Sequence, residues 1–179
     1  MPKTFPGTTI ELISMKKGSS RQIFDGLFSA GGITLSQVCV MTGLEPYLVQ
    51  NWVKRGFVSS PKKRLYSREQ FSRIIIINML RESLQIDNIC ALIGAVEGSG
   101  DSVGEEMYHS YVDMISERKI DMTDTSSLMN AIKDTSDELV SSHICSSKHL
   151  INILKIMFYA HTATLLKQSA EEILATVIE

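Results

Sequence analysis

The chain has 179 residues, an apolar fraction of 44% and a formal net charge of −2. This composition is typical of a globular protein with a core of its own, and it excludes collagen-like and low-complexity chains. The three cysteines are far apart and odd in number, so no disulfide framework is implied. No secretory signal is evident, and the most apolar window, residues 150–166, contains Lys155 and His161. We therefore expect a cytoplasmic protein that does not span a membrane.

Helical patterns dominate the chain from its N-terminus. Thr8 and Glu11 have the spacing of a capping box, which predicts a first helix through Met15. A second short helix is predicted at residues 20–29. We expect residues 1–32 to form N-terminal helices that pack on the domain that follows.

The next stretch, residues 33–97, has strong helix signals. The pairs Thr34/Gln37 and Ser67/Gln70 are capping boxes, and Pro46 suits the first position of a helix. These signals predict helices from residue 34, over 46–55 and over 67–80, and a further one at 86–96. Ile74–Ile77 has strand propensity, but the capping box and the length of the segment favour a helix.

Residues 98–104 form the clearest boundary, because three glycines and two serines fall within 97–104. We interpret this segment as a linker to a helical region over residues 105–179, with helices near 105–119, 126–142 and 147–176. The only strands that we expect are the two arms of a loop at 58–66. The predicted fold is nearly all-α.

The predicted helix over 46–55 has one apolar and one polar face. At 100° per residue, the apolar residues from Leu48 to Val53 share the side that would pack on the core. On the other side, carboxamides can pair with adenine in the major groove, lysine can reach guanine or phosphate, and tyrosine can bond to phosphate. The alternative is an ordinary solvated face. The polar side consists of Tyr47, Gln50, Asn51 and Lys54, with Arg55 next to it.

Positive charge is concentrated in the middle of the chain. Residues 33–98 carry eight basic and five acidic residues, a net charge of +3, whereas residues 99–179 carry six and thirteen, a net charge of −7. Residues 54–73 alone hold seven basic residues against one acidic residue, Glu69. This asymmetry indicates one face for a polyanion, and patchy surface charge is the alternative.

The loop at residues 59–66 carries three consecutive cations, Lys62, Lys63 and Arg64. Like charges repel unless an anion lies nearby, so we expect this loop to contact phosphates with a strong dependence on salt. Tyr66 and Arg73 are further candidate contacts; the alternatives are the core for Tyr66 and solvent for Arg73.

The middle of the chain contains a motif in three parts, namely Gly43-Leu44, Trp52-x-x-Arg55-Gly56-Phe57-Val58 and Arg64-Leu65-Tyr66-Ser67. This motif resembles the DNA-binding domain of the MerR family. The resemblance covers about residues 33–97. It implies a winged helix-turn-helix with recognition helix 46–55 and wing 59–66. The narrower pattern QNWVKRG…PKK..YS…RI.IIN is similar to a bacterial family built on such a domain, whose role is not established.

The chain departs from the MerR pattern in three ways. Gln50 and Asn51 lie where that family has Arg and Tyr, and Gln50 removes a cation that would contact phosphate. The wing is several residues shorter. A glycine-rich segment and three helices replace the long antiparallel dimer helix, so the MerR mode of promoter untwisting is not implied.

We expect the acidic region over residues 105–179 to form a homodimer, because DNA half-sites are usually paired. Its five methionines are compatible with a small apolar effector pocket, with a dimer interface or with an ordinary bundle core. We expect no cofactor. Three residues of metal-binding type form a weak pattern, namely His143, Cys145 and His149.

No enzyme is expected. The chain lacks a Walker loop, a GxGxxG motif and an HExxH motif. His109 and Asp113 have the spacing of a base and its orienting acid, but no nucleophile or oxyanion element accompanies them.

The function expected from the sequence is that of a transcriptional regulator that binds specific sites in double-stranded DNA. One alternative is an architectural or segregation protein that uses the same domain. Another is a protein-interaction module in which the Trp52 helix meets a partner chain.

Overall fold

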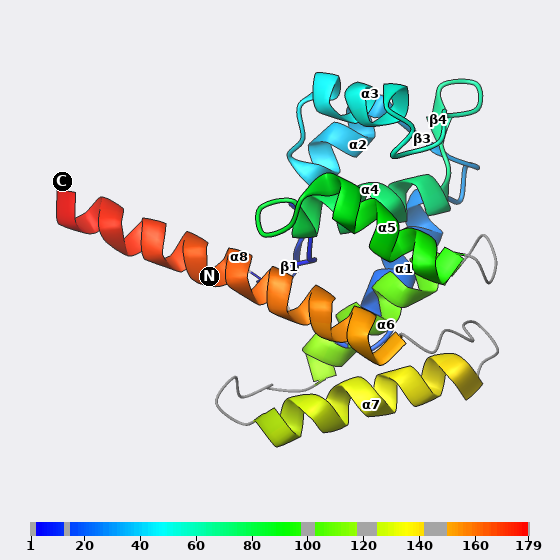
Figure 1. Ribbon diagram of the computed structural model, residues 1–179. Coiled ribbons are helices and arrows are strands. Elements are labelled where there is room, and N and C mark those ends of the chain that lie inside the picture. The colour runs from blue at the N-terminus through cyan, green and yellow to red at the C-terminus, as the bar shows by residue number, and fades with distance from the viewer. Residues whose placement is uncertain (1–2, 13–14, 98–102, 118–124, 142–149, 179) are drawn as a thin grey trace.

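The computed structural model describes residues 3–12, 15–97, 103–117, 125–141 and 150–178. This part of the chain is mostly helical, as the sequence predicts, and its strands form two short antiparallel pairs. Figure 1 shows helices crossing one another around a shared core, with α8 running along one side. None of the described helices is long and apolar enough to cross a membrane.

The N-terminus forms a hairpin, so the helix predicted from Thr8 through Met15 is wrong. Strand β1 (Lys3–Thr4) pairs with β2 (Glu11–Leu12). The Thr8 amide donates to the Phe5 carbonyl (3.0 Å), and Gly7 has a φ of 74°. Proline followed by a glycine at positive φ is the pattern of a type II turn, and the Pro6-Gly7 dipeptide was the signal for it. Gly7 is also required by space, because a Cβ there would lie 2.2 Å from the Ile75 carbonyl oxygen.

Helix α1 (Ser19–Leu27) follows, close to the predicted 20–29. Strand β3 (Ile33–Thr34) then leads into α2 (Leu35–Thr42), where Thr34 and Gln37 form the predicted capping box. Strand β3 pairs with β4 (Leu65–Tyr66). The 58–66 loop therefore supplies only one of the two strands expected from it, because the other comes from the residues before α2.

Helix α4 (Arg68–Leu80) passes through the centre of the molecule. Its isoleucines from Ile74 to Ile77 are all 0% exposed, which explains an apolar run that resembles a strand yet forms a helix buried on all sides. Ser67 and Gln70 form the predicted capping box at its N-terminus. Helix α5 (Ile86–Glu97) packs beside it.

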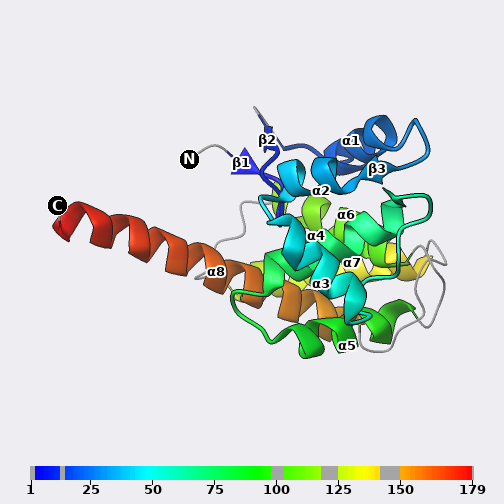
Figure 2. The same cartoon turned by 90° about the horizontal axis from the view of Figure 1, so that it is seen from above.

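The acidic region contributes three helices, close to their predicted positions. Helix α6 (Val103–Glu117) packs on both α4 and α1, and α7 (Thr125–Ser141) packs on α6 and α8. Helix α8 (Leu150–Ile178) lies on α4 and α7 with its first half. Figures 1 and 2 both show its second half projecting beyond the other helices. Of the predicted linker 98–104, residues 98–102 lie outside the described part.

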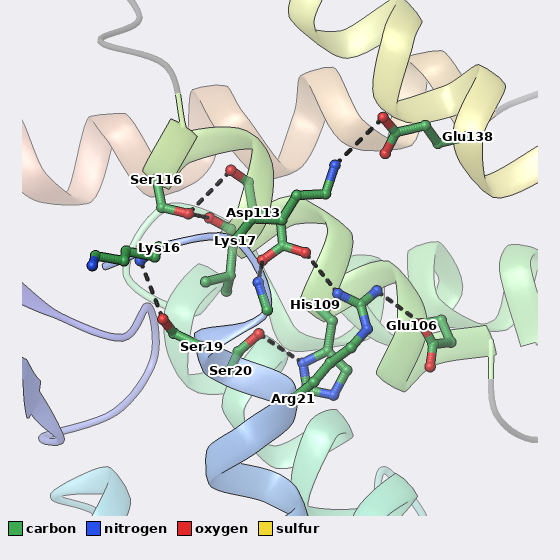
Figure 3. A network of polar contacts seen from close by, with 12 residues as sticks. Lys16, Lys17, Ser19, Ser20, Arg21, Glu106, His109, Asp113, Ser116 and Glu138 are labelled. Carbon is green, nitrogen blue, oxygen red and sulfur yellow. Dashed lines mark hydrogen bonds and ion pairs between the residues drawn. The ribbon is translucent and has the colours of Figure 1, made fainter. Parts of the chain in front are cut away.

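A network of charged groups joins α1 to α6 (Figure 3). Arg21 donates to Asp113 (2.6 Å) and to Glu106 (3.0 Å), and the Gly18 amide donates to the other Asp113 oxygen (2.8 Å). Asp113 is 6% exposed, so its charge is balanced inside the protein rather than by water. The N-terminal segment is therefore held to α6 as well as to α4.

Candidate nucleic-acid interface

Helix α3 (Pro46–Lys54) presents the predicted polar face to solvent. Val49 and Trp52 are 0% and 4% exposed and fix the opposite face on the core. Pro46 lies in the first turn, where its missing N–H costs nothing. Tyr47 is 66% exposed. The other residues of the predicted contact face are also exposed, namely Gln50, Asn51, Lys54 and Arg55.

A three-residue turn between α2 and α3 sets the direction of this face. Gly43 ends α2 with a φ of 68°, and its amide donates to the Cys39 carbonyl (2.9 Å). A side chain at this φ would be strained, which is why a glycine is suited to the turn. Asn78 of α4 donates to the Thr42 carbonyl (2.9 Å) and so fixes the end of α2 on the core.

Arg55 lies at the C-terminal end of α3. Its guanidinium lies 4.3 Å from the centre of the Phe57 ring. An arginine held over an aromatic face in this way has restricted motion and keeps its donors free for other contacts. Arg55 therefore joins the exposed face of α3 to the loop that follows.

The loop ends in a tight turn over Lys62–Leu65, with all four residues exposed. The Leu65 amide donates to the Lys62 carbonyl (2.9 Å). Lys63 and Arg64 have φ values of 50° and 67°, the pattern of a type I′ turn, which normally requires asparagine and glycine. A left-handed conformation costs a residue with a side chain about 1–2 kcal/mol. Two adjacent residues with side chains thus hold a backbone conformation that glycine and asparagine tolerate better.

Gln70 fixes the start of this loop, a role that sequence reasoning missed. Its Nε2 group donates to the carbonyls of Ser59 (2.9 Å) and Ser60 (3.0 Å). Its Oε1 atom accepts from the Ser67 amide (2.8 Å), the bond that caps α4. The capping box is visible in the sequence. The contacts of the Nε2 group with Ser59 and Ser60 are not, because they depend on how the loop packs against α4.

Tyr66 and Arg73 do not belong to the exposed face. Tyr66 is 3% exposed, and burial, with a smaller effect from Cys39, raises the pKa of its phenol. The prediction that Tyr66 contacts DNA is therefore wrong, because β4 turns its ring into the core. Arg73 is half-buried, and its Nε group donates to the Phe57 carbonyl. This contact holds the segment that follows α3.

A family model matches part of this chain. It is described as Domain of unknown function (DUF1836), and it covers residues 34–112. The matched stretch begins at the N-cap of α2 and contains α3, the Lys62–Leu65 turn, α4, α5 and most of α6. It thus continues past the predicted linker into the helix that packs on α4. No curated protein and no solved structure matches the chain.

The other candidate groups do not form a second site in the described residues. His109 lies 2.9 Å from the Ser20 hydroxyl through Nδ1 and 3.3 Å from Glu105 through Nε2, while Asp113 bonds to Arg21 and Gly18. His109 and Asp113 thus take part in the network that binds α1 to α6, and Arg68 of α4 joins it by donating to Glu105 (2.8 Å). No group of three potential metal ligands occurs in the described part of the chain. His143, Cys145 and His149 lie outside it.

Three of the methionines in the acidic region are buried in the core. Met107, Met114 and Met157 are 0%, 4% and 0% exposed. They fill space between α6, α8 and their neighbours, which fits the bundle-core interpretation. An effector pocket built from these three side chains would require them to move.

Proposed function

We propose that the chain is a transcriptional regulator that binds specific DNA sites through a winged helix-turn-helix. Helix α2, the Gly43 turn and α3 would form the helix-turn-helix, and the Lys62–Leu65 turn would be the wing. The observation that carries this proposal is the strained and exposed pair Lys63 and Arg64 in the turn that leads into β4. This turn and α3 lie at the same end of the molecule (Figure 1).

Helix α3 has the chemistry for reading bases. An α-helix with its side chains is about 10–12 Å across, which fits the major groove, about 12 Å wide. The carboxamides of Gln50 and Asn51 can each donate to and accept from the N6 and N7 edge of adenine. Lys54 and Tyr47 lie on the same exposed face and can bond to guanine or to phosphate.

The wing has the chemistry for holding the backbone. Each lysine or arginine that neutralises a phosphate releases counterions, so the affinity falls as salt rises. Gln70 and Arg73 hold the two ends of the segment between α3 and the wing, and this fixes the distance between the two contact surfaces. A rigid spacing of this kind orients α3 before it reaches the bases.

The test is a fluorescence anisotropy titration of genomic fragments, including the region upstream of the gene itself, at several salt concentrations. Replacing Lys62 and Lys63 with Ala should weaken binding to every fragment and reduce the slope of log K against log salt by about 2. Replacing Lys16 and Lys17 with Ala is the matched control. These are two adjacent exposed lysines, one of which pairs with Glu138 of α7, remote from α3.

Replacing Gln50 and Asn51 with Ala should leave the salt slope unchanged. Preference for the best fragment should fall by about 1–3 kcal/mol for each side chain that no longer pairs with a base. If both double variants bind DNA as the wild-type protein does, the proposed interface is wrong. Absence of salt-dependent binding would instead favour a protein-interaction module. Genome-wide occupancy at many weak sites, rather than at a few strong ones, would favour an architectural protein.

A further inference from the structure

Helix α8 is apolar on two opposite faces. One face lies against the rest of the molecule through buried side chains such as Ile153, Leu154 and Met157. Beyond Thr164 no residue of the helix is buried, yet the projecting half still carries six large apolar side chains. Their exposed fractions range from 49% to 75%, and they are Leu165, Leu166, Ile173, Leu174, Val177 and Ile178.

The exposed apolar residues include a regular repeat, which we call the α8 seam. Its steps are alternately three and four residues, the heptad spacing of a coiled coil, over three heptads. At 1.5 Å per residue the seam is about 32 Å long. All its members are exposed, including two alanines, and the exposed fractions of the large ones rise from 40% at Ile156 to 74% at Val177. The seam consists of Ile156, Tyr159, Ala163, Leu166, Ala170, Ile173 and Val177.

The spacing of this repeat indicates which kind of surface should pack against it. A seam with a period of 3.5 residues fits another helix that carries the same repeat. Apart from the residues of α8, the exposed large apolar side chains of the described chain are scattered ones, namely Val40, Tyr47, Leu65 and Val140. No second helix of the described part presents such a stripe, so the matching helix is α8 of a second copy.

We infer that the chain forms a homodimer by packing the α8 seam against the same seam of a second copy. From Tyr159 to Ile173 large and small residues of the seam alternate, which favours the antiparallel arrangement. In that arrangement Tyr159 would lie opposite the partner's Ala170, Leu166 opposite the partner's Ala163, and Ile156 opposite the partner's Ile173. A parallel pair would instead set tyrosine against tyrosine and alanine against alanine, which leaves gaps between bulky layers.

The exposure of these apolar side chains supports a stable pair. Monomeric proteins rarely expose a contiguous apolar patch larger than about 300–600 Å². The projecting half of α8 buries none of its residues, so the described part of the chain leaves its apolar side chains uncovered. Pairing two copies would cover both seams in one two-fold interface. This inference is independent of DNA binding, since none of the seam residues belongs to α3 or to the wing.

Sedimentation equilibrium of the full chain without DNA tests the inference. The wild-type protein should be a dimer at micromolar concentration. Replacing Leu166 and Ile173 with Lys should weaken self-association by at least about 100-fold, because it places charges in the middle of the seam. Both side chains are more than half exposed, so the fold of each protomer should be retained, as circular dichroism would show. The matched control replaces Gln168 and Ala175 with Lys, seven residues apart on the opposite side of the same helix.

Four results would overturn the inference. The wild-type protein could stay monomeric, or the seam variant could dimerise as tightly as the wild type. The control variant could dissociate as much as the seam variant, or a monomer could bind lipid vesicles through the seam. Cross-linking tests the orientation. Proteins carrying Ile156→Cys and Ile173→Cys should cross-link to each other when mixed, and cross-linking of Ile173→Cys with itself would overturn the antiparallel arrangement.

Discussion

Gln70 shows how one side chain can couple a helix cap to a functional loop. Its carbonyl oxygen caps α4, and its amino group binds the carbonyls of Ser59 and Ser60. An amide is suited to this position because it offers an acceptor and a donor at opposite corners of one planar group. Glutamate could replace it in the cap but not in the loop.

Replacing Gln70 with Glu should therefore destabilise the protein by about 1–3 kcal/mol, because a carboxylate would face two carbonyl oxygens. The control is Gln37→Glu, which makes the same change at the same position of the α2 capping box. Gln37 is exposed and caps only Thr34, so that variant should keep its stability within about 0.5 kcal/mol. Urea unfolding of the two variants measures the difference. Equal effects would show that the contacts to the loop contribute nothing.

Relieving the strain of the turn at Lys63 and Arg64 should change the stability and the DNA affinity in opposite directions. Lys63→Asn together with Arg64→Gly supplies residues that tolerate positive φ, so the protein should become more stable by about 1–2 kcal/mol. The same variant should bind DNA more weakly under the proposed function. The control is Lys62→Asn, since Lys62 has no positive φ and should lose affinity without a gain in stability. Thermal unfolding and anisotropy titration measure the two effects, and an unchanged melting temperature would contradict the strain argument.

At the scale of elements, the docking of α1 on α6 depends on buried charge rather than on the number of ion pairs. Arg21 binds Asp113 and Glu106 where Asp113 is almost fully buried. By contrast, Lys17 and Glu138 are 3.6 Å apart with both side chains more than half exposed. Exposed pairs contribute little, whereas the loss of one partner from a buried pair leaves a charge without compensation.

Arg21→Met should consequently destabilise the protein by about 2–3 kcal/mol. This is below the full value for a buried pair, because 36% of the Arg21 side chain is exposed. Glu138→Gln removes the charge of the exposed pair and should change the stability by less than about 0.5 kcal/mol. Chemical denaturation compares them. If Glu138→Gln lost as much stability as Arg21→Met, burial would not determine how much an ion pair contributes to stability.

At the scale of the whole molecule, a partly buried histidine, His161, helps to join α8 to the body. The Nδ1 atom of His161 lies 2.8 Å from the Tyr111 hydroxyl of α6. Burial lowers the pKa of His161 from 6.5 to about 4. His161 also lines a hollow between α4, α8 and the N-terminal hairpin, together with Arg81, Glu82, Lys167 and Glu171.

This shift of the pKa makes stability depend on pH. Between pH 6.5 and about 4 the unfolded chain binds a proton at this residue while the folded chain does not. The contribution of His161 is therefore complete above pH 6.5 and is lost as the pH falls to about 4, with a total of about 3 kcal/mol. His161→Gln should flatten the curve of unfolding free energy against pH in that range. A curve with the same slope as the wild type would assign the pH dependence to other groups.

Much of the fold followed from local signals. The predicted bounds of α2 to α8 lie within a few residues of those observed. They were derived from the capping boxes at Thr34 and Ser67, from Pro46 in a first turn and from the apolar periodicity. The faces of α3 also followed from the 100° repeat alone. These features depend on neighbours in the sequence, which is why periodicity and cap chemistry detect them.

The errors arose where distant segments decide the structure. The Thr8 hydroxyl, which suggested a helix cap, instead donates to the Phe5 carbonyl in a hairpin that packs over α4. Tyr66 belongs to a strand whose partner, Ile33, precedes it by 33 residues, so its burial was not visible in the loop sequence. The contacts of Gln70 with Ser59 and Ser60 likewise depend on how the loop packs against α4, so the sequence did not reveal them.

By itself, the sequence determined the mostly helical fold, the two faces of α3 and the run of cations at residues 62–64, because each is a property of local spacing and charge. Only the tertiary structure decided which of those cations are held in left-handed conformations and that Tyr66 is buried. It also decided which apolar side chains of α8 remain uncovered. Burial depends on which elements meet in space, and a helix that is apolar on two faces does not reveal which face the core will take.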